Sequence, residues 1–64
     1  MTEYVPAEIS VSDLRVKIAD IANATAVDGQ ITYITNRGRR IAAIVPVRDG
    51  DEAVRRRAGQ QPTD

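Results

Sequence analysis

A chain of 64 residues with neither cysteine nor histidine must fold without disulfide bridges and without a zinc site. A domain of this size buries only about 60% of its unfolded surface, so a core of its own would be marginal. Small domains usually gain the missing stability from crosslinks, metals or a partner. The carboxylates are scattered along the chain and predict no metal site. We therefore expect a homodimer, and no cofactor.

The spacing of apolar residues separates one helical segment from the extended segments. It predicts an amphipathic helix over residues 11–27, ended by Asp28-Gly29, because glycine readily takes the left-handed conformation after a last turn. The apolar face of this helix consists of Leu14, Ile18, Ile21, Ala22 and Thr25. Ser10 precedes Asp13 by three residues, the spacing of a capping box, so Ser10 is expected to cap the helix.

Alternating, mostly β-branched residues predict two strands after the helix, over residues 31–35 and 40–45. The residues between them, Asn36-Arg37-Gly38-Arg39, predict a tight turn, so these two strands should form a hairpin. A further short strand is predicted over residues 8–11. The order strand-helix-strand-strand predicts an α+β fold, a small antiparallel sheet with one packed amphipathic helix.

The composition changes after Val47. Residues 48–64 are highly charged, offer one large apolar residue, Val54, and are expected to be weakly ordered alone. Residues 52–58 could form two turns of helix. We therefore divide the chain into a dimerising domain, residues 1–47, and a short charged tail after it.

The charges cancel overall but not locally. Residues 1–32 carry two cations against five carboxylates, and residues 33–64 carry seven arginines against four carboxylates. Three of these arginines surround Gly38 at the predicted turn. A turn needs the glycine but not three cations, so the cluster favours contact with a nucleic-acid backbone. The alternative is a solvated turn that discourages aggregation between sheet edges.

Two segments of the chain resemble the Phd/YefM family of antitoxins. The first begins the predicted helix and reads Ile9-Ser10-Val11-Ser12-Asp13-Leu14-Arg15. The second covers the predicted hairpin and reads Ile34-Thr35-Asn36-Arg37-Gly38-Arg39-Arg40-Ile41-Ala42-Ala43-Ile44-Val45-Pro46. Each is a weak motif alone, but the two together in one small chain are a fairly specific signal. The sequence departs from the family pattern at Asn36, usually a basic residue, and at Ile41, often a proline.

The resemblance implies a homodimer whose sheets and helices join into one DNA-binding body. It also implies that the dimer represses its own operon by binding operator DNA upstream of its gene. Whether dimers assemble further on the DNA is left open. The residues expected at the DNA are Ser12, Arg15, Asn36, Arg37, Arg39 and Arg40. The residues alone favour helix capping for Ser12, and contact with a phosphate is its other interpretation.

The resemblance further implies that the tail after the dimerising domain wraps a cognate toxin. The residues expected to contact the toxin are Val54, Arg55, Arg56 and Arg57. The arginines of this set have two other interpretations, a second arm on DNA and a solvated tail that keeps the chain soluble.

No catalytic constellation accompanies these features. The chain lacks histidine, cysteine and a phosphate-binding glycine loop, so we expect no enzyme. No apolar run reaches the roughly 18 residues of a membrane span, and the first residues do not resemble a signal peptide, so we expect a cytoplasmic protein. Two other hypotheses stay open. The chain could be a protein-binding inhibitor or adaptor without DNA binding, or a stand-alone small transcriptional regulator with no toxin.

Overall fold

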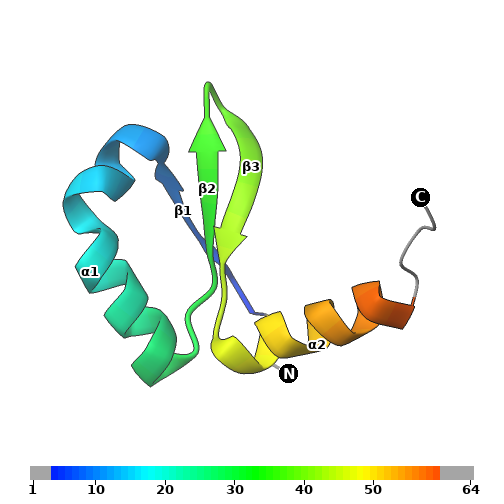
Figure 1. Cartoon of the computed structure of the whole chain (residues 1–64). Helices are drawn as coiled ribbons and strands as arrows, with labels where there is room; N and C mark the ends of the chain where they lie inside the picture. The colour runs from blue at the N-terminus through cyan, green and yellow to red at the C-terminus, as the bar shows by residue number, and fades with distance from the viewer. Residues whose placement is uncertain (1–3, 60–64) are drawn as a thin grey trace.

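The structure is a computed structural model, and it describes residues 4–59. Its elements follow in the order β1 (Ala7–Ser10), α1 (Val11–Asp28), β2 (Thr32–Asn36), β3 (Arg39–Ile44) and α2 (Val47–Gly59). The three strands form one sheet in the order β1-β2-β3, and α1 packs against β1 and β2 (Figure 1). The α+β class is confirmed, and the bounds of the first four elements lie within one residue of those predicted.

Helix α1 has the two ends that the sequence predicts. The Ser10 hydroxyl accepts a hydrogen bond from the Asp13 N–H at 3.2 Å, which satisfies one of the free amides of the first turn. At the other end, Gly29 has a φ of 73° and its N–H donates to the Thr25 carbonyl. These two caps set the length of α1 and therefore where the chain enters β2.

The sheet is mixed, which corrects the expectation that it is antiparallel throughout. Strands β2 and β3 form the expected antiparallel hairpin, but β1 runs parallel to β2. The cause is the helix between them: α1 carries the chain back along the sheet, so β2 starts again at the end where β1 started. The parallel pairing therefore places the start of α1 and the hairpin turn at the same end of the sheet.

The helix in the tail is longer than predicted. Residues 47–59 form one helix of 13 residues, α2, whereas the sequence suggested two turns over residues 52–58. Asp49 in the first turn and Arg56 in the last turn complement the helix dipole, which helps to explain its length. Helix α2 hardly contacts the other elements and projects from the end of the sheet (Figure 1). Neither helix in residues 4–59 is long and apolar enough to span a membrane.

Helix α1 and the sheet bury little apolar surface between them. Among the described residues only Thr25 and Thr32 are buried, at 4% and 3% exposure, and no apolar side chain is fully buried. Leu14, Ile21 and Ile34 are half-buried. A single copy of the chain therefore lacks a closed apolar core.

Candidate nucleic-acid interface

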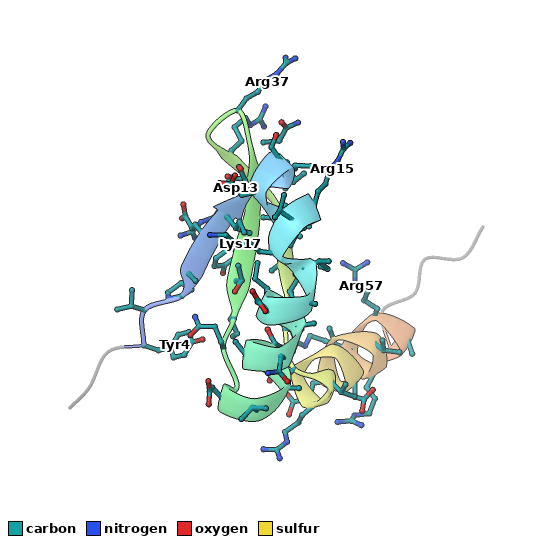
Figure 2. All side chains as sticks on the ribbon, turned by 90° about the vertical axis from the view of Figure 1, so that its left-hand side faces the viewer. Tyr4, Asp13, Arg15, Lys17, Arg37 and Arg57 are labelled. Carbon is teal, nitrogen blue, oxygen red and sulfur yellow. The ribbon has the colours of Figure 1, made fainter. Side chains whose placement is uncertain are left out.

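The two segments that the sequence analysis singled out meet at one end of the molecule. Ser10 pairs with Thr35, and α1 begins at the residue after Ser10. The residue after Thr35 is the last of β2, and the hairpin turn comes directly after it. Figure 2 shows Arg37 at the tip of the hairpin and Arg15 on the first turns of α1 at the same end, both directed outward. Both side chains are exposed.

The backbone at the tip of the hairpin is unusual. Arg37 has a φ of 56° and Gly38 a φ of 79°, and Arg37 is the only non-glycine residue with positive φ in the described chain. Positive φ at both central residues characterises the type I′ turn, which prefers Asn-Gly at these positions. Asn36 comes one position too early to supply that asparagine. An arginine in the left-handed region costs on the order of 1 kcal/mol, a strain that suggests a role for its side chain.

The hairpin places its arginines on opposite faces. Asn36 pairs with Arg39, and by the alternation of side chains along β2 Asn36 shares a face with Thr32, whose burial indicates that this face packs against α1. Arg39 therefore lies on the same side as Arg15. Arg40 is opposite Thr35 and belongs to the other face, because a bulge in β3 skips one residue between the pairs made by Ile34 and Thr35.

Arg40 is held on that other face by two neighbours. Its Nε and Nη2 atoms donate to Glu8 Oε2 at 2.9 and 2.6 Å. Its guanidinium carbon lies 4.0 Å from the centroid of the Tyr33 ring. About half of each charged side chain is exposed, so the ion pair contributes roughly 0–1 kcal/mol. These contacts direct Arg40 away from the cluster formed by Arg15, Arg37 and Arg39.

The serines at the start of α1 have different positions. Ser10 is the cap, and Ser12 is exposed in the first turn of the helix. The free amides of a first turn, together with the positive end of the helix dipole, favour phosphate groups. Ser12 thus lies where its hydroxyl could add to an anion contact beside Arg15.

The expected toxin-binding residues lie on α2, away from the arginine cluster. Helical spacing places Val47, Val54 and Ala58 on one side of α2, and it distributes Arg55, Arg56 and Arg57 around the rest. Val47 and Val54 are 79% and 66% exposed. Val47 was expected in the preceding domain but belongs to α2, and its helical spacing to Val54 and Ala58 is the signal that could have placed it there.

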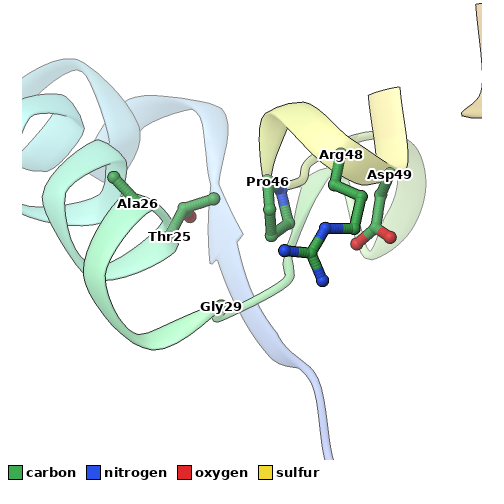
Figure 3. Close-up of a pocket in the computed structure, with 6 residues that line it drawn as sticks. All are labelled: Thr25, Ala26, Gly29, Pro46, Arg48 and Asp49. Atoms are coloured by element: carbon green, nitrogen blue, oxygen red, sulfur yellow. The ribbon is translucent and has the colours of Figure 1, made fainter. Parts of the chain in front are cut away.

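A pocket of about 410 Å³ lies between the end of α1 and the start of α2 (Figure 3). Its lining consists of Thr25, Ala26, Gly29, Pro46, Arg48 and Asp49. The buried hydroxyl of Thr25 has no hydrogen-bond partner within residues 4–59. In the same part of the chain, no three carboxylates gather in a way that could hold a metal ion. The sequence predicted Thr25 only as part of the apolar face and gave no sign of this pocket.

No protein family, curated protein or solved structure shows a significant match to this chain. Arg15, Arg37 and Arg39 are exposed, Figure 2 shows Arg15 and Arg37 at one end of the molecule, and Arg39 follows the hairpin turn opposite Asn36. Such an arrangement suits an extended polyanion better than a small ligand.

Proposed function

We propose that this chain is a dimeric, DNA-binding autorepressor and antitoxin of the Phd/YefM type, acting in the cytoplasm. The observation that carries the proposal is that the strand pairings bring the first turns of α1, with Arg15, and the hairpin turn, with Arg37 and Arg39, to one end of the molecule. Figure 2 shows Arg15 and Arg37 directed outward at that end. The planar guanidinium group donates in pairs to phosphates and to the guanine edge, so these three residues hold the operator. Ser12 and Asn36 flank them as secondary contacts, and an asparagine can read adenine.

The homodimer is supported by the absence of a closed core. No apolar side chain of the described residues is fully buried, and several large ones are exposed. A second copy would cover part of this surface and would double the number of arginines that face DNA. Two-fold symmetric regulators bind two half-sites in this way.

The neutralising part of the proposal concerns residues 48–64. Helix α2 leaves the sheet with three consecutive arginines and hardly any contact to the other elements, as expected of a segment that binds elsewhere. Arg55, Arg56 and Arg57 would meet an acidic surface of the toxin, with Val54 as the candidate apolar anchor.

The first experiment is titration of the purified chain with DNA from upstream of its own gene, at a series of salt concentrations. Arg15, Arg37 and Arg39 of two copies make six phosphate contacts at most, which sets the steepest log–log salt slope at about −5. Specific binding with a slope approaching this value is expected. A folded dimer that binds no operator DNA would end the repressor proposal.

A matched pair of variants locates the DNA contact. Replacing Arg37 and Arg39 by alanine should remove operator binding and leave the dimer intact. Replacing Arg55 and Arg56 by alanine removes the same charge from α2 and should leave operator binding largely unchanged. If the α2 variant loses as much affinity as the hairpin variant, α2 is a second arm on DNA.

A second candidate function is a protein-binding module without DNA binding. The observation that favours it is the exposed apolar side of α2, with Val54 66% exposed. Binding of the neighbouring gene's product without any operator binding would identify this function. Operator binding without a protein partner would instead identify a stand-alone regulator.

A further inference from the structure

One copy of the chain leaves apolar surface in water. Among residues 4–59, no apolar side chain is fully buried, and eight large apolar side chains are exposed. A standard protein interface buries roughly 800 Å² of each partner, much of it apolar. The chain therefore offers uncovered apolar surface that an interface with a second copy would bury.

The first uncovered surface lies between α1 and β3. Helix α1 packs on β1 and β2 and leaves β3 without a cover. Ile18, Ala22 and Ala26 follow one another at four-residue intervals along α1, and all three are exposed. In a right-handed crossover this side of α1 faces β3, where Ala42 is also exposed on the α1 side of the sheet. We call this surface the α1–β3 face.

The pocket near Pro46 agrees with this orientation. Thr25 and Ala26 at the end of α1 line it from one side, and Pro46 lines it from the other (Figure 3). The pocket therefore continues the α1–β3 face to the point where the chain leaves the sheet for α2. Most side chains on this face are alanines, which are small. Another helix could therefore approach the face closely.

The second uncovered surface is the apolar side of α2, formed by Val47, Val54 and Ala58, which we call the α2 ridge. Helix α2 points away from the sheet (Figure 1), and its contacts with the other elements are few among the described residues. Val47 and Val54 of the ridge are 79% and 66% exposed. At 1.5 Å per residue, Val47 to Val54 spans about 10 Å, and Ile18 to Ala26 on the α1–β3 face spans about 12 Å. The two surfaces thus match in length and in apolar character.

We propose that two copies of this chain exchange their α2 helices, so that the α2 ridge of each copy packs on the α1–β3 face of the other. The proposal rests on the homodimer of the proposed function and adds the surfaces that form it. It assigns Val54 to the second copy instead of the toxin. Arg56, on the opposite side of α2 from Val54, stays outside and available to a further partner.

Cysteine crosslinking tests the contact directly, because the chain has no cysteine of its own. An Ala22→Cys variant is mixed with a Val54→Cys variant that carries a size tag, and the mixture is oxidised. We expect a covalent dimer with one chain of each kind. A Val16→Cys variant is the matched control, since Val16 is 83% exposed but lies outside the α1–β3 face, and it should not crosslink to Val54→Cys.

Two crosslinking results would overturn the proposal. Equal crosslinking of Val54→Cys to itself would mean that the two α2 helices pair with each other. An internal crosslink within a monomer of the double variant, Ala22→Cys with Val54→Cys, would mean that α2 folds back onto its own chain.

Sedimentation of two further variants measures the energetic contribution of the ridge. Val54→Asp should raise the dimer dissociation constant at least about tenfold, and Val16→Asp should leave it unchanged. An unchanged dimer in Val54→Asp would contradict the exchange. Because no DNA is present, failure here is distinguishable from failure of the proposed function: a dimer through other surfaces could still bind the operator.

Discussion

Ser10 and Thr35 are partners across the parallel strands β1 and β2, although 24 residues, among them the whole of α1, separate them in the chain. The residue after Ser10 starts α1, and the residue after Thr35 ends β2 at the hairpin turn. One backbone pairing therefore brings the start of the helix and the arginine-rich turn to the same end of the molecule. The candidate DNA-binding surface depends on this pairing more than on any side-chain contact.

Arg37→Asn should separate function from stability at the hairpin tip. Asparagine tolerates positive φ better than arginine. The free energy of unfolding of the variant, measured in urea at a fixed protein concentration, should therefore be about 0.5–1 kcal/mol higher than that of the original chain. Loss of the guanidinium should lower operator affinity at least about tenfold. Arg37→Lys is the control that keeps both the charge and the strain. Wild-type affinity in Arg37→Asn would remove Arg37 from the DNA contact.

Arg39→Ala and Arg40→Ala should behave differently, although the two residues are adjacent. Arg39 lies on the α1 side of the hairpin, so its loss should weaken operator binding at least about fivefold. Arg40 is engaged with Glu8 and Tyr33, so its loss should lower stability by up to about 1 kcal/mol and change DNA affinity little. Filter binding and urea unfolding measure the two effects. Equal losses of affinity would mean that Arg40 leaves Glu8 when DNA binds.

Ser10→Ala and Ser12→Ala should separate capping from anion contact. Ser10→Ala removes the hydrogen bond to the Asp13 amide and should cost about 1 kcal/mol of stability, with loss of helix content seen by circular dichroism. Ser12→Ala should leave stability within about 0.5 kcal/mol, because Ser12 is exposed and is not the cap. A fall in operator affinity for Ser12→Ala would identify it as a phosphate contact. If Ser12→Ala were less stable than Ser10→Ala, the assignment of Ser10 as the cap would be contradicted.

Thr25→Val should stabilise the fold. The Thr25 hydroxyl is buried without a partner among the described residues, and valine keeps the shape of the side chain. Removing a buried, unpaired hydroxyl should raise the free energy of unfolding by about 1 kcal/mol. Thr25→Ser, which keeps the hydroxyl and loses the methyl group, serves as the control and should be destabilised. If Thr25→Val is the less stable of the two, the hydroxyl has a partner in the folded dimer.

The sequence predicted the local features of this fold well. Helical spacing and the Ser10 and Gly29 signals placed α1 within one residue at each end, and the glycine between basic residues placed the hairpin. These features depend on neighbours a few residues away, which the sequence displays directly. The extent of helix in the tail was underestimated: α2 covers residues 47–59, whereas the sequence suggested two turns over residues 52–58, because a segment with so few apolar side chains is a weak helix candidate.

Three features were decided only by tertiary structure. The direction of β1 beside β2 follows from how α1 crosses the sheet, and the Ile34/Thr35 bulge decides that Arg39, not Arg40, lies on the α1 side. Packing also decides that α1 covers β1 and β2 while β3 and α2 stay uncovered. Strand direction, register and cover depend on contacts between residues far apart in the chain, so local propensities leave them undetermined.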